Sequence, residues 1–343
     1  MERKKALYGL TLAQLEELCR ELQLPRYAAA QIARRLYRHH ARSFDEMTEL
    51  SKTARAALAE RFETGLSEPL RRSVSADGTK KYLFRTSEGA FIESAYIPDR
   101  DRATLCVSSQ AGCRMGCRFC ATGRQGLQHS LPAADILNQI ISLPERQSLT
   151  NLVFMGMGEP LDNLDALLTV LEILTAEWGF AMSPTRITVS TAGIGSGLEE
   201  LLSRTQVHVA VSLHNPFPNE RALIMPVEKA WPAAGIIETL RRYDFSRQRR
   251  ISFEYIVMSG LNDTPRHIRQ LARLLNGLRC RINLIRFHKI EGSPYFSPDT
   301  AAMERFRDAL SAKGITTTIR ASRGEDIEAA CGLLSTLEMN RSK

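Results

Sequence analysis

The chain has 343 residues and a formal net charge of +8, from 46 Lys and Arg against 38 Asp and Glu. Hydrophobic residues make up 43% of the sequence and charged residues 24%, which excludes wholesale disorder and predicts a globular protein of about two domains. No apolar run reaches the roughly 18 residues of a membrane span, and the first one, residues 6–10, is too short for a signal peptide. We therefore expect a cytoplasmic protein.

Helical periodicity marks the N-terminal part of the chain, and we expect a small helical domain over residues 1–75. Apolar residues recur at helical spacing between residues 12 and 22. The next predicted helix, residues 28–42, places Arg34, Arg38 and Arg42 four residues apart on one face. Such a basic face fits either an ordinary solvated surface or contact with nucleic acid.

The middle and C-terminal parts alternate between strand and helix patterns. Two strand patterns joined by a short turn predict a β-hairpin linker over residues 76–101. From residue 102 to 343, alternation predicts an α/β fold with parallel strands, in the form of a partial (βα)6-type barrel. The predicted strands cover residues 104–108, 151–155, 186–191, 207–213, 251–258, 281–287 and 316–320. The predicted helices cover residues 133–143, 164–176, 197–203, 234–243, 266–276 and 301–312.

Three of the seven cysteines lie within eight positions, directly after the first barrel strand. Cys113, Cys117 and Cys120 form a CxxxCxxC spacing on a glycine-rich loop. Three thiolates can hold three irons of a [4Fe–4S] cluster and leave the fourth iron open. Structural zinc is the main alternative, but it requires four ligands, and the nearest spare candidates are Cys106 and His129.

The sequence around this spacing resembles the radical S-adenosylmethionine (SAM) RlmN/Cfr family. The resemblance rests on residues 104–127, on Met-Gly-Met-Gly-Glu-Pro at 155–160 and on residues 323–332, and it extends over nearly the whole chain. It implies a radical SAM barrel with a [4Fe–4S] cluster and SAM as cofactors. It also implies methylation of an aromatic carbon of adenosine in 23S rRNA, and in the RlmN branch of certain tRNAs.

The resemblance implies a set of SAM contacts at the carboxyl ends of the barrel strands. Gly158 and Glu159 belong to a motif that contacts the methionyl amino group, and a carboxylate facing an ammonium makes a charge-assisted hydrogen bond. The remaining implied contacts, to the methionine and ribose parts, are Ser190, Ser212, Leu213, His214 and His288. A serine at a strand end can instead be a turn or helix cap. His288 departs from the family, where many relatives carry Asn.

Two further cysteines and one acid acquire roles only through the resemblance. Taken alone, Cys331 and Cys106 read as small buried hydrophobes, and Glu93 as a solvent-facing strand residue. The resemblance implies that Cys331 carries the methyl group, that Cys106 completes turnover and that Glu93 is an acid near the target adenine. In the implied reaction one SAM methylates Cys331, and a second provides the radical that activates the methyl group. A disulfide between Cys106 and Cys331 then closes the cycle.

The implied partners are 23S rRNA, tRNA and a flavodoxin-like or ferredoxin-like electron donor. We expect the protein to be a monomer and not to bind a membrane. Arg34, Arg38 and Arg42 are candidates for phosphate contact, and Arg114, Arg118 and Arg124 near the cysteine loop for contact with RNA or SAM. Two alternatives remain: carbon-8 methylation of the same adenosine, and a non-enzymatic RNA-binding protein with a zinc knuckle. Gly-Glu-Pro at 158–160 and Tyr-Ile-Pro at 96–98 favour carbon-2.

Overall fold

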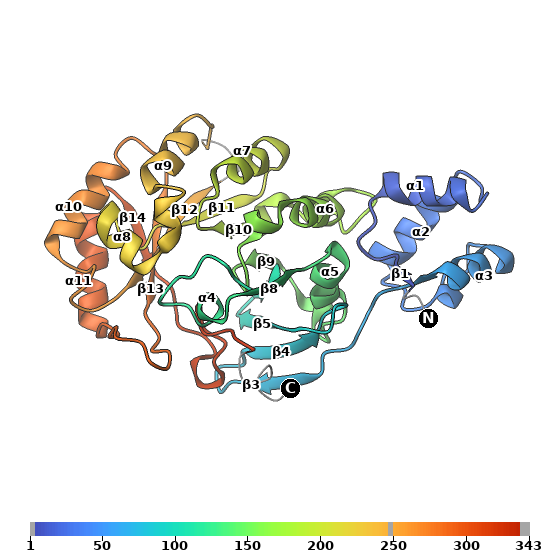
Figure 1. The fold of residues 1–343 in the computed structure, drawn as a ribbon, viewed down its shortest axis with the longest axis horizontal. Coiled ribbons are helices and arrows are strands. Elements are labelled where there is room, and N and C mark those ends of the chain that lie inside the picture. Colours follow the sequence, from blue (N-terminus) through green and yellow to red (C-terminus); the bar gives the residue numbers. More distant parts are fainter. Residues whose placement is uncertain (1–3, 246–249, 337–343) are drawn as a thin grey trace.

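The computed structural model describes residues 4–245 and 250–336, and its main feature is one ten-stranded sheet (Figure 1). The barrel wall consists of successive parallel strands. These strands are β6 (Arg102–Cys106), β9 (Asn151–Phe154), β10 (Ile187–Thr191), β11 (His208–Ser212), β12 (Ile251–Val257), β13 (Arg281–Arg286) and β14 (Thr316–Ile319). The sheet is open, with β14 at one edge and β3 at the other. The predicted partial barrel is confirmed.

Helices alternate with these strands and cover the outer face of the sheet (Figure 1). They are α5 (Ala133–Ile141), α6 (Leu164–Thr175), α7 (Gly195–Arg204), α9 (Ala233–Arg241), α10 (Pro265–Leu274) and α11 (Thr300–Ser311). Every residue of β12 is buried, as expected for a central parallel strand covered on both faces. Because the strands run in parallel, their carboxyl ends meet at one rim, where barrel enzymes place their sites.

The predicted hairpin continues the barrel sheet. It consists of β4 (Lys80–Arg85) and β5 (Phe91–Asp99), with the unpredicted β3 (Arg71–Val74) at its outer side. Strand β5 pairs antiparallel with β6, and this register places Ala95 opposite Cys106. The hairpin therefore lies next to Cys106, one of the candidate site residues. The domain boundaries at residues 75 and 101 remain a prediction.

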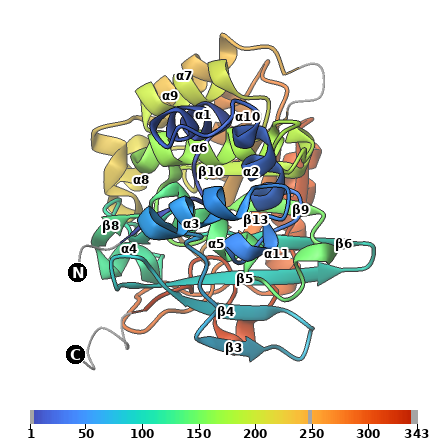
Figure 2. The ribbon, with the colours of Figure 1, turned by 90° about the vertical axis from the view of Figure 1, so that its right-hand side faces the viewer.

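The N-terminal helices lie at one end of the molecule, beyond α5 and α6 (Figures 1 and 2). The elements are β1 (Lys5–Ala6), α1 (Leu12–Glu21), α2 (Ala28–Tyr37), α3 (Lys52–Arg61) and β2 (Phe62–Glu63). They are docked by packing: the ring of Tyr37 meets that of Trp178 edge-on at 5.8 Å. The Arg38 side chain also donates a hydrogen bond to the carbonyl of Glu177.

The expected single basic face of residues 28–42 is wrong. Helix α2 ends at Tyr37, and the chain turns at His40, whose φ is +53°. Arg38 is thus the C-cap residue, and Arg42, which pairs with Glu68, lies outside the helix. Of these three arginines only Arg34 lies within the helix, and it is exposed.

Short 3-10 helices connect the larger elements, at Phe44–Glu46, Arg146–Ser148, Pro160–Asn163, Pro184–Arg186, Pro226–Lys229 and Glu325–Ile327. None of the helices in the described ranges has the length and apolar character needed to cross a membrane.

Candidate active site

The cysteine loop is closed at its base by a small two-stranded sheet. Strand β7 (Gln110–Gly112) pairs antiparallel with β8 (Leu127–Ser130), and the loop between them ends in the short helix α4 (Ala121–Gln125). Cys113 N–H donates to the Gly126 carbonyl at 3.0 Å. Gly112 has φ +80°, and a Cβ there would lie 1.8 Å from that carbonyl oxygen, so only glycine allows the loop to close.

Cys113, Cys117 and Cys120 line one cavity of about 140 Å³ at the strand ends. Burial raises the pKa of all three thiols, that of Cys113 to about 12. Neighbouring thiols raise the pKa of each further: Cys120 acts on Cys113 and Cys117, and Cys331 acts on Cys120. Because metal ligation requires thiolates, a positively charged group is needed to stabilise them together. The described residues contain no set of three or more His, Cys, Asp or Glu able to hold a single metal ion. The donor set is three thiols, which can hold three irons of a [4Fe–4S] cluster and leave the fourth iron open.

Glu159 presents an oriented carboxylate to the same cavity. Its oxygens accept hydrogen bonds from Thr191 Oγ1 (2.6 Å), Ala192 N–H (2.8 Å) and Leu161 N–H (3.1 Å). Burial raises the pKa of Glu159 to about 7 although these donors lower it. A carboxylate accepts about four hydrogen bonds, so this one can still accept from an ammonium group. Gly158 precedes it with φ +99° and lies too close to Gln110 for a Cβ.

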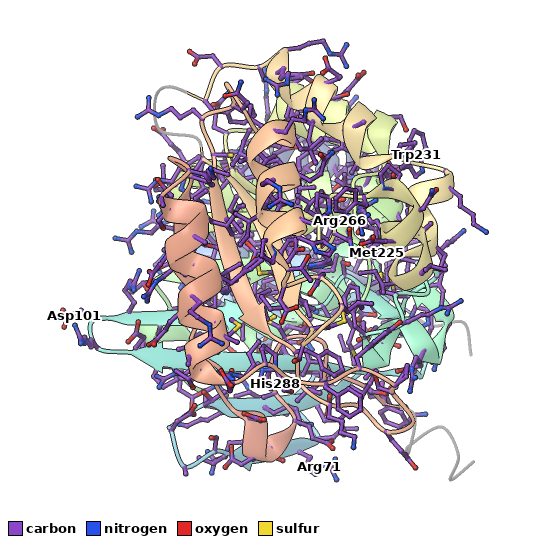
Figure 3. The ribbon with its side chains drawn as sticks, turned by 90° about the vertical axis from the view of Figure 1, so that its left-hand side faces the viewer. Arg71, Asp101, Met225, Trp231, Arg266 and His288 are labelled. Atoms are coloured by element: carbon purple, nitrogen blue, oxygen red, sulfur yellow. The ribbon has the colours of Figure 1, made fainter. Side chains whose placement is uncertain are left out.

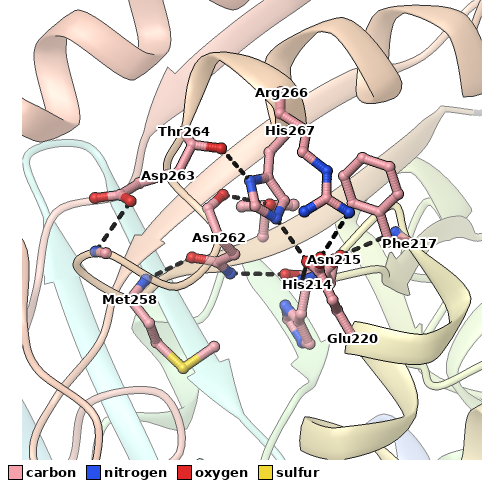
Figure 4. A network of polar contacts seen from close by, with 12 residues as sticks. His214, Asn215, Phe217, Glu220, Met258, Asn262, Asp263, Thr264, Arg266 and His267 are labelled. Atoms are coloured by element: carbon pink, nitrogen blue, oxygen red, sulfur yellow. Dashed lines mark hydrogen bonds and ion pairs between the residues drawn. The ribbon is translucent and has the colours of Figure 1, made fainter.

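Ser190, Ser212 and His214 line the same cavity, and their contact with SAM remains a prediction. The Nδ1 atom of His214 accepts from the Ile256 N–H at 3.0 Å, and its carbonyl accepts from Asn262 Nδ2 at 2.7 Å (Figure 4). Burial, and then the charge of Arg221, lowers the pKa of His214 to about 3, so the ring is neutral. The proton therefore sits on Nε2, which makes this atom a hydrogen-bond donor.

Arg221, on the short helix α8 (Pro218–Ile224), is fully buried and fixes this wall from behind. Its guanidinium donates to the carbonyls of Leu213 and Ser212, both at 2.9 Å, and pairs with Glu228. Sequence reasoning missed Arg221, since only its burial distinguishes it from a surface arginine. Leu213 itself is buried outside the cavity lining, so its contact with SAM remains a prediction.

A second and larger cavity of about 560 Å³ adjoins the first, and Cys331 lines both. Cys106 lines the larger cavity, where burial and the neighbouring Cys331 raise its pKa to about 12. Both cysteines are free thiols in the structure. His288 also lines the larger cavity, with Nδ1 3.2 Å from Glu325, and lies toward the antiparallel strands in Figure 3. Its contact with SAM remains a prediction.

The segment after Cys331 is fastened to the helix that follows the cysteine loop. Ala121 N–H donates to the Gly332 carbonyl at 2.8 Å, and Thr122 Oγ1 donates to the Leu334 carbonyl at 2.6 Å. Gln125 exchanges two hydrogen bonds with Thr336, of 2.8 and 3.1 Å. These bonds hold Cys331 beside the cluster loop.

Glu93 is buried on β5 but lines neither cavity. Its carboxylate pairs with Lys81 at 3.1 Å and accepts from the Ser335 N–H at 3.1 Å. Burial raises the pKa of Glu93, and Lys81 acts against this shift. Its proton-transfer role remains a prediction.

The three arginines of the cysteine loop are in different situations. Arg114 pairs with Asp162 at 2.8 Å, and Arg124 donates to the carbonyls of residues 291 and 292. Arg118 is exposed. Arg114 and Arg124 thus interact with groups of the protein itself, and Arg118 is the best candidate of the three for contact with RNA.

Comparisons with known proteins agree with this geometry. The model of the radical SAM superfamily matches residues 107–275, and that of the ribosomal RNA large subunit methyltransferase N-terminal domain matches residues 5–64. A probable dual-specificity RNA methyltransferase RlmN of Parabacteroides distasonis is 56% identical over 97% of both chains. The chain belongs to the RlmN family.

The RlmN family assignment is supported at lower identity and in three dimensions. A dual-specificity RNA methyltransferase RlmN of Desulfosudis oleivorans is 41% identical over 96% of this chain and 90% of the relative. The crystal structure of a radical SAM methyltransferase from Sphaerobacter thermophilus matches with a TM-score of 0.90 and 43% identity, over 96% and 99% of the two chains. As a radical SAM enzyme the chain uses a [4Fe–4S] cluster and SAM. Neither the carbon-8 branch nor a zinc-knuckle protein gains support.

Proposed function

We propose that this enzyme methylates carbon-2 of adenosine in 23S rRNA and in tRNA, with Cys331 as the methyl carrier and two SAM molecules per turnover. The observation that carries the proposal is the position of Cys331, which lines both the cavity of the cysteine trio and the larger cavity. A group attached to its sulfur can therefore be exposed to SAM on one side and to a nucleobase on the other. The relatives are dual-specificity RNA methyltransferases, which fits action on two kinds of RNA.

The chemistry explains why a carrier is needed. Carbon-2 of adenine lies between two ring nitrogens, is electron-poor and has no lone pair, so it cannot attack the methyl group of SAM. The Cys331 thiolate can, by ordinary substitution that releases S-adenosylhomocysteine. Cys113, Cys117 and Cys120 would hold the cluster, which would supply the electron for reductive cleavage of a second SAM and thus a hydrogen-abstracting 5′-deoxyadenosyl radical.

The chain's own residues then complete the transfer. The methyl group on Cys331 loses a hydrogen atom, and its carbon forms a bond to carbon-2 of the adenine. A base removes the ring proton, with Glu93 or Cys106 as the candidates. The bond from Cys331 to the transferred carbon breaks, the carbon gains a proton as a methyl group, and the Cys331 sulfur radical bonds to the Cys106 thiolate. The one surplus electron then leaves the new disulfide, and a cluster held by Cys113, Cys117 and Cys120 would be its acceptor. The resulting disulfide must be reduced before the next cycle.

The partners follow from this reaction. The target base must leave its stack to enter a cavity at the barrel rim, so the enzyme must hold RNA around the site. Arg34 on α2 and Arg118 beside the cysteine loop are exposed cations suited to phosphate contact. A flavodoxin-like or ferredoxin-like protein provides the electron. We place the enzyme in the cytoplasm as a monomer.

The test adds SAM, a low-potential reductant and unmodified 23S rRNA or tRNA to the anaerobically reconstituted protein. We expect 5′-deoxyadenosine, S-adenosylhomocysteine and 2-methyladenosine, identified by mass spectrometry of the digested RNA. 8-Methyladenosine as the product would overturn the carbon-2 assignment. Colourless protein that contains zinc and no iron would overturn the proposal that the protein is a radical SAM enzyme.

A further inference from the structure

Arg320 is a partly buried cation in the larger cavity, which we assign to the target base. It directly follows β14 and lines the larger cavity together with Cys106 and Cys331. The site motifs of the sequence do not include it, because nothing near residue 320 marks a ligand.

The orientation of Arg320 is fixed by Glu254, a buried carboxylate that lines the smaller cavity. Its Nη1 atom lies 3.3 Å from Glu254 Oε2 and 3.2 Å from Met155 Sδ. Glu254 is in turn held at Oε1 by Asn283 Nδ2 at 2.7 Å and by Ser252 Oγ at 3.1 Å. The Glu254 side chain is 3% exposed, whereas 33% of the Arg320 side chain is exposed. A buried carboxylate therefore anchors Nη1 of a guanidinium whose residue lines the larger cavity.

The other cations that line this cavity are turned toward protein groups. Arg323 donates to the Pro98 carbonyl and lies 3.8 Å from Asp77. Arg102 is largely exposed and pairs with Asp99. Arg320 is the lining arginine whose Nε–H and Nη2–H have no bonded partner in the described part of the chain.

We propose that Arg320 is a catalytic residue that donates a hydrogen bond to N1 of the target adenine. This inference rests on the proposed carbon-2 reaction. Flipped bases are read by hydrogen bonds to their Watson–Crick edge, where adenine N1 is an acceptor. N1 is bonded to carbon-2, so a cation that donates to N1 draws electron density away from the carbon under attack. The proton stays on Arg320 throughout, and no bond-making step is added.

The same hydrogen bond discriminates between purines. Guanine carries a hydrogen on N1 and an amino group on carbon-2, so its edge would oppose a donor with another donor. A buried donor left without an acceptor costs more free energy than the hydrogen bond itself provides. Arg320 thus selects adenine and activates it through one contact.

The test uses the full enzyme with reconstituted cluster and RNA substrates that carry adenosine, 1-deazaadenosine or 3-deazaadenosine at the target position. Each analogue lacks one of the two nitrogens that flank carbon-2, so the pair is matched in electronic effect, and only the 1-deaza base lacks N1. Transfer to RNA is measured in single turnovers. For the wild type we expect the 1-deaza RNA to react roughly 10- to 100-fold more slowly than the 3-deaza RNA, as for loss of one hydrogen bond to a charged group.

Variants at Arg320 distinguish a contact with the target base from a purely structural role of this side chain. Arg320→Gln should slow transfer to adenosine by roughly 10- to 100-fold and abolish the difference between the two analogues. The double variant Arg320→Gln with Glu254→Gln removes the carboxylate that the single variant leaves without its cation, and should show the same loss of discrimination. Arg320→Lys should recover part of the rate. The control Arg242→Gln, which loses an exposed pair with Glu199 elsewhere, should react as the wild type does.

Two results would overturn the proposal. One is equal reaction of the 1-deaza and 3-deaza RNAs with the wild type, and the other is an unchanged difference between them in Arg320→Gln. A wrong proposed function would give a different result: the wild type would form no 2-methyladenosine in unmodified RNA.

Discussion

Two regions deliver cysteines to the same cavity, and they are built in opposite ways. The cluster loop, residues 113–126, is closed by its own neighbours β7 and β8 and by the Cys113–Gly126 hydrogen bond. The C-terminal segment, residues 324–336, carries Cys331 and is held by groups more than 200 residues away, among them Thr122, Gln125 and Asp77. The loop can therefore form from local sequence, whereas the segment depends on the rest of the fold.

This difference predicts where a substitution loses the cofactor and where it loses only the transfer. The largest effect is expected at the base of the cluster loop. Gly112→Val would place a Cβ against the Gly126 carbonyl at a positive φ, at a cost of about 4 kcal/mol or more. We expect loss of most cluster iron and of all methylation, measured by iron content and RNA product.

The control for this change is Gly235→Ala in α9, where an added Cβ meets no atom within 4 Å. It should keep full iron content and activity. Normal iron content in Gly112→Val would show that the loop closes in some other way.

A second change weakens the attachment of the C-terminal segment and should leave cluster binding unchanged. Gln125→Ala removes both hydrogen bonds to Thr336, so Cys331 is held less firmly. We expect transfer to RNA to fall roughly 10-fold, because small misplacement of a reacting group is costly. Iron content and reductive SAM cleavage should stay normal. Gln128→Ala, exposed on β8, is the matched control. Equal loss of iron and transfer would contradict the separation of the two regions.

A third change tests the other end of the segment through pH. Burial raises the pKa of Asp77, but hydrogen bonds from Thr79 and from the Gly324 N–H outweigh it and lower the pKa to about 2. The stabilising effect of this carboxylate is thus fully present above pH 4 and is lost as the pH falls through about 2.

We expect Asp77→Asn to loosen residues 324–336 by a few-fold in amide hydrogen exchange at neutral pH, with a similarly small loss of transfer. The difference from the wild type in resistance to acid should disappear near pH 2. A difference that grows toward low pH would have the wrong sign for this account.

The smallest effect is expected outside both regions, on the N-terminal helices. Arg34→Glu should weaken RNA binding several-fold and lower the slope of log affinity against log salt by about 0.7 to 0.9 per lost phosphate contact. Arg20→Glu, on α1, provides the control. SAM cleavage should be unchanged in both variants. An unchanged salt slope in Arg34→Glu would remove α2 from the RNA-binding surface.

The same contrast explains what could be predicted from the sequence. Strand and helix periodicity is local, so β10, expected at residues 186–191, is found at Ile187–Thr191. The motif positions Glu159, Ser190, Ser212 and His214 do gather on one cavity, because the carboxyl ends of parallel strands share a rim.

Long-range contacts and chain turns could not be predicted in this way. Arg221 and Arg320 look like ordinary arginines, and only burial and their carboxylate partners reveal them. The turn at His40 interrupts a helical pattern that periodicity alone extends to Arg42. Nothing near Cys331 indicates its attachment to α4, since its partners lie about 210 residues earlier.

The most direct test of the central claim, that Cys331 carries the carbon delivered to the base, traps that carbon on the protein. Cys106→Ala is incubated anaerobically with SAM, reductant and RNA, digested with nuclease and protease, and analysed by mass spectrometry. The account predicts an adenosine joined through one carbon to the sulfur of Cys331. An adduct on another residue, or repeated release of 2-methyladenosine by a Cys331→Ala variant, would contradict it.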